Sequence, residues 1–291
     1  MPRLRMALMA AIALMSAVLA GEEPVPAPGA AAPFRILTWN IQYGSDRGAD
    51  ANGWPERKAA LRSAIEAEKP DVFCAQEALA GQLEFLDGLL PKHSREGVGR
   101  DDGKKAGEHC AVYWDTRRFE RLDGGTFWLN ETPDKPGTAW GEQYNRICTW
   151  VRLKDKASGR TLRVFNMHLP LVAEAREKAA GLVAGRIGKV GKDDAVIAAG
   201  DLNSGPGGPA WKALEGCGLA GAEKSAGGKP GTATFHHKGI PLVCLDAIFI
   251  SDSWAVKRHR VVGGPLQKAY PSDHFGVAAT LEWREAAKPA P

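Results

Sequence analysis

Polar residues capable of acid–base chemistry and metal binding follow several apolar, strand-like runs of this sequence. They are Asn40 after ILTW, Glu77 after VFCAQ, Asn166 and His168 in VFNMHL, Asp201 and Asn203 in AAGDLN, and Asp246 within VCLDAIF. Such side chains are costly inside a sheet unless they form hydrogen bonds or bind a ligand. Because several of them end at one edge of the predicted sheets, we expect them to share a pocket.

The spacing of these residues predicts which side chains point together. Asp201 and Asn203 are two residues apart, and so are Asn166 and His168. Side chains two apart project from the same face wherever the strand stays extended. Each pair is therefore expected to face one side of its sheet.

Asp246 lies on the same face of its predicted strand as apolar neighbours, so its carboxylate needs a polar partner. The chain offers His274, which lies in the late SDHFG segment. A carboxylate that holds an imidazole in one tautomer is a common way to prepare a catalytic histidine. We therefore expect these two side chains to pair.

The elements that must position these residues alternate between strands and helices. Apolar runs predict strands at FRILTWNI, DVFCAQE, HCAVYW, TFWLN, ICTWVRL, RVFNMHL, AVIAAGDLN, VCLDAIFI and FGVAATLEW. Helical patterns cover residues 55–68 and 172–190, and residues 154–160 (KDKASGR) predict a hairpin turn. Mixed hairpins and strand–helix alternation indicate an α/β fold of two packed sheets flanked by helices.

The composition is that of a globular protein. The chain has 291 residues, of which 44% are hydrophobic and 25% charged. This is enough to bury one substantial core, and it excludes disorder, collagen and coiled coil as the main organisation. One domain is expected over residues 34–284, after a flexible Pro/Ala-rich leader at 21–33 and before a frayed, disordered tail at 285–291.

Residues 1–20 have the pattern of a signal peptide. Arg3 and Arg5 precede an apolar stretch, and Val18-Leu19-Ala20 forms a small-residue cleavage site. The apolar stretch, about 13 residues, is shorter than the about 20 needed to span a bilayer as a helix. We expect export to the periplasm or the outside of the cell, with no stable membrane anchor; a retained N-terminal anchor is the alternative.

The charge balance does not indicate a nucleic-acid binder. The net charge is +4, and removal of Arg3 and Arg5 with the signal peptide lowers it to +2. Proteins that track phosphates usually show a clear excess or a dense cluster of Lys and Arg. A local basic patch remains compatible with this balance.

The cysteines do not form a metal or redox motif. There are five, without a CxxC pair, which argues against a zinc ribbon or a thioredoxin-type site. Four lie in apolar runs, where a buried cysteine behaves as a small hydrophobe. Export would permit one disulfide or two, and the sequence does not name the pairs.

Six short motifs occur in a characteristic order. They are TWNIQYG (38–44), AQE (75–77), NMHL (166–169), GDLN (200–203), LDAIF (245–249) and SDH (272–274). In this order they resemble the endonuclease/exonuclease/phosphatase superfamily, which includes pancreatic-type deoxyribonuclease, abasic-site endonucleases, inositol polyphosphate 5-phosphatases and bacterial sphingomyelinases. Residues 125–137 and 146–153 further resemble a bacterial, secreted branch of largely unassigned substrate.

The resemblance implies a deoxyribonuclease I-like fold. This fold is a four-layer α/β sandwich, with two packed mixed β-sheets flanked by helices and the site at the top of the sheets. It also implies a divalent metal bound by Glu77, with Asn40 as a contributor and Asp273 near a second metal position. Oxygen donors of this kind suit Mg²⁺, or Mn²⁺ or Ca²⁺ outside the cell.

The resemblance also implies catalytic roles. Asp201 would position or deprotonate the attacking water, Asn203 would bind a phosphate oxygen, and His168 would contact the phosphate or assist the leaving group. His274 would be the essential imidazole, oriented by Asp246. Whether Asp201 or His274 takes the proton of the water stays open.

Other polar and aromatic residues are expected in supporting, surface or core positions. Arg146 and Asn166 are expected, from their neighbourhood, near the phosphate or in a supporting position. His109, His236, His237 and His259 are expected at the surface or in supporting positions, and Trp54, Trp128, Trp140 and Trp211 mostly in the core. The Gly-rich residues 227–239 could form a substrate loop or a plain connection.

Together these patterns predict an exported, metal-dependent phosphoesterase. It would hydrolyse a phosphodiester or phosphomonoester by direct water attack, without a covalent intermediate and without an obligate protein partner. The substrate stays open between nucleic acid and a sugar-phosphate, inositol-phosphate or phospholipid headgroup. The rival hypothesis is a catalytically silent binding module on the same fold, which predicts a gap in the motif set. The set has no gap.

Overall fold

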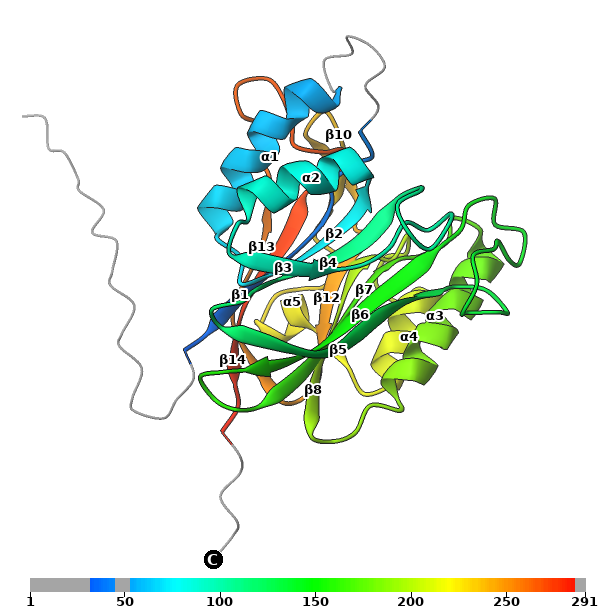
Figure 1. Cartoon of the computed structure of the whole chain (residues 1–291), viewed down its shortest axis with the longest axis vertical. Coiled ribbons are helices and arrows are strands. Elements are labelled where there is room, and N and C mark those ends of the chain that lie inside the picture. Colours follow the sequence, from blue (N-terminus) through cyan, green and yellow to red (C-terminus); the bar gives the residue numbers. More distant parts are fainter. Residues whose placement is uncertain (1–31, 45–52, 286–291) are drawn as a thin grey trace, which may run out of the picture.

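Alternating apolar side chains along the strands build two sheets that bury one face each against the other (Figure 1). The computed structural model describes residues 32–44 and 53–285. The predicted signal peptide, the leader up to residue 31 and the tail from residue 286 lie outside the described residues. Among the described residues, no helix combines the length and the apolar character needed to cross a bilayer.

The first sheet has six strands. In spatial order they are β13 (Trp254–Val262), β14 (Gly276–Trp283), β1 (Phe34–Asn40), β2 (Val72–Ala78), β4 (His109–Asp115) and β3 (His93–Glu96). β1 and β2 run parallel, and the other neighbouring strands are antiparallel. Helices α1 (Trp54–Glu68) and α2 (Ala80–Leu89) pack on the outer face, where Leu61 and Leu83 join its apolar cluster.

The second sheet also has six strands. Their order is β5 (Phe119–Trp128), β6 (Ile147–Asp155), β7 (Thr161–His168), β8 (Asp194–Asp201), β12 (Asp246–Ile250) and β9 (Ala220–Gly221). Only β7 and β8 run parallel within it. Helices α3 (Ala173–Ile187) and α4 (Pro209–Gly216) cover its outer face (Figure 1).

Two smaller elements complete the described chain. Helix α5 (Ala222–Ser225) lies beside β12 and β13. A short hairpin of β10 (Phe235–His237) and β11 (Ile240–Val243) forms a separate two-stranded sheet. The hairpin joins the site end of the molecule, because Phe235 forms a β-bridge with His274.

The inner faces of the two sheets form the central core and fix the register of the strands. In β1, Phe34 and Ile36 point into this core, whereas Leu37 and Trp39 point outward beneath the helices. Burying each such large side chain stabilises the fold by about 1.5–3 kcal/mol. A slip of one residue would exchange the two faces, so the same burial that stabilises the sheets also aims the polar residues at the strand ends.

The predicted two-sheet sandwich is confirmed, and so is the hairpin turn between β6 and β7. The predicted helices correspond to α1 and α3, although α3 ends at Ile187 rather than at residue 190. The apolar runs of the sequence did not predict strands β3 and β13. Both are edge strands of the first sheet: β3 is entirely polar, and in β13 the run Lys257–Arg260 interrupts the apolar residues.

Candidate active site

The strand topology gathers polar residues at one edge of the sandwich. The parallel pairs β1–β2 and β7–β8 end at this edge, and the antiparallel strands β4, β6 and β12 begin there. Residues from opposite ends of these strands therefore meet. The predicted residues placed here are Asn40, Glu77, Arg146, His168, Asp201 and Asp246.

Asp201 lies between two imidazoles at the centre of this edge. Its Oδ2 atom is 3.4 Å from His168 Nε2 and 3.8 Å from His274 Nε2. The Nδ1 atom of His274 is 2.8 Å from Asp246 Oδ2. Asp246 is also opposite Asp201 in the β8–β12 pairing, so two carboxylates flank one imidazole.

Burial sets the charges of this cluster, because Asp201, Asp246 and His274 are almost inaccessible to solvent. Burial and the charge of Asp246 raise the pKa of Asp201, against the opposing effect of His274. Burial lowers the pKa of His274, but the charge and hydrogen bond of Asp246 outweigh it and raise that pKa above its usual value. His274 is therefore an imidazolium at neutral pH, held between two acids.

His168 carries the opposite protonation state. Burial, followed by the positive charges of Arg146 and Arg100, lowers its pKa well below the usual value. Its Nδ1 atom is buried and has no hydrogen-bond partner among the described residues. The two imidazoles beside Asp201 thus differ: His274 is charged and His168 is neutral.

Glu77 is held by a distorted end of β2. The strand has a bulge between Ala75 and Ala78, and Glu77 has a φ of 63°, which is uncommon outside glycine. Its Oε2 atom accepts a hydrogen bond from Tyr43 N (2.9 Å), and its Oε1 atom accepts one from Asn40 Nδ2 (2.9 Å). The bulge turns this carboxylate toward the cavity instead of along the strand.

Asn40 links the two halves of the cluster. Its Nδ2 atom also donates to Asp201 Oδ2 (3.0 Å), while its Oδ1 atom accepts from Gln42 N (3.0 Å). In this arrangement Asn40 positions Glu77 and Asp201 through N–H groups. Its oxygen would reach a metal only after the amide turned over.

The segment that carries His274 is fixed by its neighbours. Ser272 Oγ donates to Asn40 O (2.6 Å) and accepts from His274 N (3.0 Å), and Trp39 Nε1 donates to His274 O (2.8 Å). Gly276 is required beside this indole, because a Cβ atom there would lie 2.8 Å from the Trp39 ring. The imidazole is therefore positioned before any ligand binds.

A cavity of about 580 Å³ opens above these residues. Its lining comprises Tyr43, Glu77, Arg100, Glu108, Tyr144, Arg146, His168, Leu171, Asp201, Asn203, Phe235, Leu245, Asp273 and His274. Asn203 Nδ2 donates to Leu169 O (2.9 Å), which holds the Asn203 side chain at the cavity wall. The Arg146 side chain is buried, and no described residue forms a hydrogen bond or ion pair with its guanidinium.

Asn166 lies below the cavity and does not line it. Its Oδ1 atom accepts from Gln76 Nε2 (2.7 Å), and its Nδ2 atom donates to Ala75 O and Ala111 O. Both amide hydrogens are used by these bonds between the two sheets. Asn166 therefore supports the floor of the site and has no donor left for a phosphate.

Among the described residues, two sets of side chains could hold a metal ion. The ligand atoms of Glu77, Glu108 and His168 lie within 4.8 Å of one another, and so do those of Asp201, Asp246 and His274. The second set is closed by the hydrogen bond between Asp246 and His274. In the first set Glu108 is paired with Arg100 (2.5 Å), so Glu77 and the unpartnered Nδ1 atom of His168 are the donors left for a cation. Asp273 belongs to neither set.

Comparison with known proteins identifies the family. The model of the endonuclease/exonuclease/phosphatase family matches residues 37–274. The chain belongs to this family. Consistent with that, the structure of an endonuclease/exonuclease/phosphatase protein from Bacteroides vulgatus is 31% identical, has a TM-score of 0.80 and covers 87% of this chain and 100% of its own.

Two further relatives differ in how much they share. The structure of a mannosyl-6-phosphatase from Bacteroides thetaiotaomicron is 30% identical, with a TM-score of 0.75, and the match covers 85% of this chain and 99% of that one. An uncharacterized protein of Acanthamoeba polyphaga mimivirus is 26% identical over 165 residues, 52% of this chain. The chain spans 59% of the length of this viral relative.

One wall of this endonuclease/exonuclease/phosphatase cavity was missed by the sequence reasoning. Arg100, Glu108 and Tyr144 line it. The predicted site residues follow strands, whereas Glu108 stands directly before β4, which runs antiparallel to β2 and begins where β2 ends. A polar residue immediately before the apolar run HCAVYW was the available signal.

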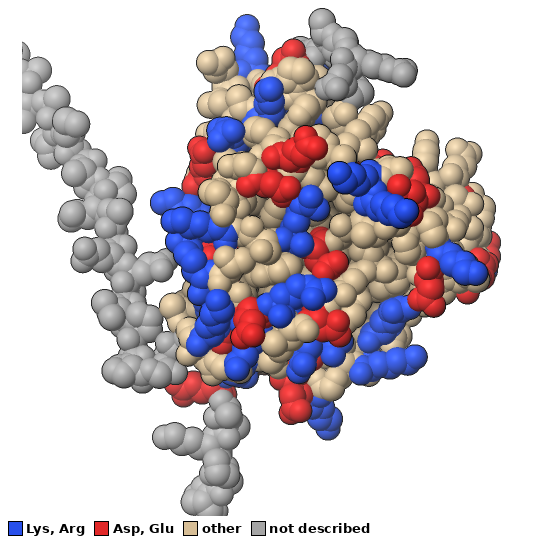
Figure 2. Space-filling model, viewed as in Figure 1, with Lys and Arg blue, Asp and Glu red and all other residues tan. Residues whose placement is uncertain are grey.

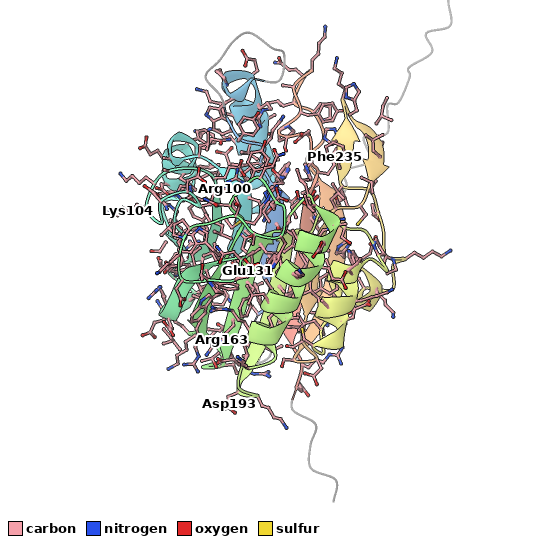
Figure 3. The ribbon with its side chains drawn as sticks, turned by 90° about the vertical axis from the view of Figure 1, so that its right-hand side faces the viewer. Arg100, Lys104, Glu131, Arg163, Asp193 and Phe235 are labelled. Atoms are coloured by element: carbon pink, nitrogen blue, oxygen red, sulfur yellow. The ribbon has the colours of Figure 1, made fainter. Side chains whose placement is uncertain are left out.

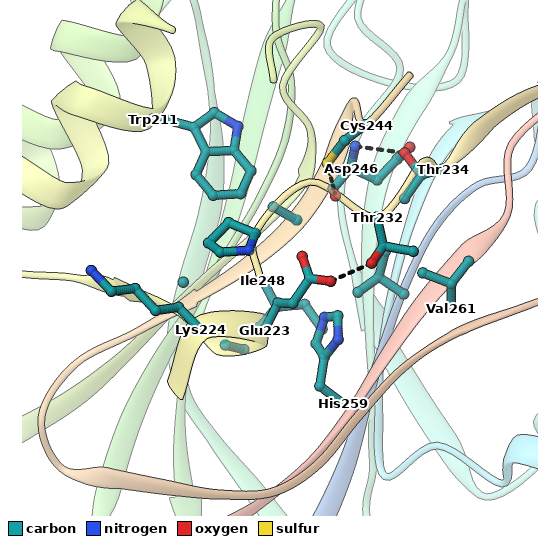
Figure 4. A pocket seen from close by; sticks show the side chains of 15 residues that line it. Trp211, Glu223, Lys224, Thr232, Thr234, Cys244, Asp246, Ile248, His259 and Val261 are labelled. Carbon is teal, nitrogen blue, oxygen red and sulfur yellow. Dashed lines mark hydrogen bonds between the residues drawn. The ribbon is translucent and has the colours of Figure 1, made fainter. Parts of the chain in front are cut away.

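The remaining histidines lie outside the cavity. His109 is buried and bonds Ala78 O, His236 packs between Tyr270 and Phe275, and His237 is exposed. His259 lines a separate narrow pocket behind Asp246, which also contains Trp211 (Figure 4). None of these side chains is among the residues that line the 580 Å³ cavity.

The tryptophans and cysteines behave as core residues. Trp54, Trp128, Trp140 and Trp211 all pack against apolar clusters and do not line the cavity. All five cysteines are free thiols, and four of them are buried. Residues 227–234 connect α5 to the β10–β11 hairpin, and residues 235–239 belong to the hairpin and contribute Phe235 to the cavity.

Proposed function

We propose that this protein is a metal-dependent phosphoesterase that hydrolyses the phosphate ester of a small phosphorylated sugar by direct attack of water. The observation that carries the proposal is the convergence of Asp201, His274 and His168 in one cavity with the buried Arg146, whose Nε atom has no hydrogen-bond partner among the described residues. A buried cation without a partner is costly, and an anionic substrate would compensate it. The membership in a family of phosphoesterases supports the same chemistry.

The donor set favours a hard divalent cation. Glu77 would hold it through a carboxylate oxygen, with the Nδ1 atom of His168 beside it, and Mg²⁺ or Mn²⁺ suits such ligands. When bound, the cation neutralises charge on the phosphoryl oxygens. Asn40 keeps Glu77 in place for this role through its N–H group.

Asp201 and His274 divide the proton chemistry between them. Asp201 orients the attacking water and accepts its proton. The pKa of this carboxyl is raised toward neutral pH, and a general base is most effective when its pKa lies near the pH at which it works. His274 is held as a cation by Asp246 and donates a hydrogen bond to the phosphoryl group. Asn203 and Arg146 bind further phosphoryl oxygens from the cavity wall.

Three features favour a small sugar phosphate over a nucleic acid. A cavity of about 580 Å³ has the size of a small-molecule site. Figure 2 shows Lys and Arg interspersed with Asp and Glu across the displayed face, without a continuous basic track. The Bacteroides structure at 30% identity is named as a mannosyl-6-phosphatase. The pattern of residues 1–20 extends the proposal to an exported enzyme.

The proposal is tested by phosphate release from mannose 6-phosphate, p-nitrophenol release from bis-p-nitrophenyl phosphate, and strand cleavage of plasmid DNA and RNA, each with magnesium or with excess chelator. We expect release from the sugar phosphate with magnesium only. A His274→Ala variant should lose about 10²- to 10⁴-fold, because an aligned acid–base group contributes that much. Equal rates for the variant and the wild type would support a silent binding module. Cleavage of nucleic acid alone would overturn the sugar substrate.

A further inference from the structure

The cavity continues beyond the catalytic cluster to a wall that the phosphate chemistry does not use. This wall is formed by Arg100, Glu108 and Tyr144, with Leu171 at its edge. Figure 3 labels Arg100 and Phe235 in the upper half of the molecule, on opposite sides of its axis. A substrate whose phosphate meets His274 would extend its other end toward this wall.

Arg100 and Glu108 form a buried pair in the wall. Arg100 Nη1 lies 2.5 Å from Glu108 Oε2, and their side chains are only 11% and 17% exposed. The hydrogen bond from Arg100 uses the Oε2 atom of Glu108. The pair thus offers an acceptor and several donors side by side, which is the requirement of a hydroxyl group that both donates and accepts.

Tyr144 supplies an apolar surface next to this pair. Its side chain is half-exposed, and the guanidinium carbons of Arg100 and Arg146 lie 5.4 Å and 5.8 Å from its ring centre. The ring therefore extends from the phosphate-binding Arg146 to the polar pair. An aromatic ring in this position suits the C–H face of a sugar ring.

The wall is rigid because three loops are tied together. Trp128 Nε1 donates to Arg100 O (2.7 Å), and Asn145 Nδ2 donates to Asp101 Oδ1 (3.2 Å). Glu142 Oε2 accepts from Leu171 N (2.6 Å). The groups of the wall are thus ordered before a ligand arrives, which lowers the entropic cost of binding.

We infer that Arg100, Glu108 and Tyr144 form a sugar-recognition subsite, with the Arg100–Glu108 pair binding ring hydroxyls and Tyr144 packing against the ring. The inference rests on the proposed function. It identifies the sugar ring as the part of the substrate that the enzyme recognises at this wall. A second phosphate is disfavoured at this wall, because burial, which together with the charge of nearby Glu77 raises the pKa of Glu108 to about 7, already opposes negative charge there.

The test compares mannose 6-phosphate with cyclohexylmethyl phosphate, which has a similar ring and phosphate ester but no ring hydroxyls. We expect the wild type to prefer the sugar at least 10-fold in kcat/KM. Glu108→Gln and Tyr144→Ala should each lower this preference about 10-fold, since a hydrogen bond to a charged group contributes about 1.5–3 kcal/mol. Tyr144→Phe keeps the ring and should retain most of the preference.

Glu96→Gln provides the matched control. Glu96 also pairs with an arginine, Arg121, but the pair lies outside the cavity. This variant should leave both kcat/KM values unchanged. Equal losses on the two esters in Glu108→Gln and Tyr144→Ala would overturn the subsite, because they would show a general effect on folding or catalysis.

Binding measurements distinguish a wrong subsite proposal from a wrong proposed function. Calorimetry of the two esters in the Asp201→Asn background with magnesium should show tighter binding of mannose 6-phosphate, and Glu108→Gln should remove the difference. Preferential binding without turnover by the wild type would retain the subsite and refute the proposed function. Turnover of both esters without a binding preference would refute the subsite alone.

Discussion

The two ends of the sandwich use the same residue types for opposite purposes. At the end below β7 and β8, Asp194 lies 2.9 Å from Arg152 Nε and 2.8 Å from Arg163 Nε. At the site end, Asp201 and Asp246 are even less exposed than Asp194, and their ion-pair partners are histidines. Figure 3 labels Arg163 and Asp193 at the end opposite Arg100 and Phe235.

The pKa shifts of the two ends have opposite signs. Burial works against ionisation of Asp194, but the hydrogen bonds from Arg152 and the other donors lower its pKa to about 2. At the site, burial and the charge of Asp246 raise the pKa of Asp201. The end at Asp194 thus stabilises the charged form of its carboxylate. The site end instead contains carboxyl groups whose negative charge is compensated only in part. This difference leaves the site ready for a cation and a phosphate.

The largest expected effect comes from Asp246→Asn, which removes the carboxylate that holds His274. We expect turnover to fall about 10²- to 10⁴-fold, as for other oriented catalytic histidines. The pKa of His274 should also fall, because Asp246 raises it by charge and by a hydrogen bond. NMR titration of the imidazole measures this shift.

Asp252→Asn is the control, because Asp252 is exposed in the turn that follows β12. It should change neither turnover nor the titration of His274. An unchanged titration curve in Asp246→Asn would show that the pairing of Asp246 with His274 does not set the charge of this imidazole.

A smaller effect is expected from Asp194→Asn at the lower end. The folded pKa of Asp194 is about 2 against an ordinary 3.8, so its stabilising contribution is present above about pH 4 and disappears as the pH falls toward 2. Because its partners are partly exposed, we expect the variant to lose about 1 kcal/mol of unfolding free energy at neutral pH. Denaturant unfolding should show this difference shrinking in acid, with turnover unchanged. A difference that is constant with pH would contradict the ion-pair explanation.

The central core and the strand-end residues were predictable because strand periodicity carries that information. The parity of Asp246 followed from alternation alone, and the family motifs added the ordered set. What alternation cannot give is strand direction. Glu108 lies at the site because β4 is antiparallel to β2, and that pairing is decided by contacts far apart in the sequence.

Other features of the site could not be predicted from the sequence, because they depend on side-chain partners. Asn166 stands two residues before His168, yet three hydrogen bonds between the sheets occupy it beneath the cavity. Arg100 and Tyr144 lie in connecting loops, where no periodicity reports position. Their place at the cavity follows from the loop-to-loop bonds of Trp128, Asn145 and Glu142.

The central claim is that the site end gives up stability for chemistry, and Asp201→Asn tests it most directly. Turnover of the sugar phosphate and unfolding free energy should be measured together on this variant at neutral pH. We predict a loss of at least about 10²-fold in turnover, with unfolding free energy unchanged or increased, because a buried carboxylate next to Asp246 is removed. Retained turnover, or a loss of stability as large as that of Asp194→Asn, would contradict the account.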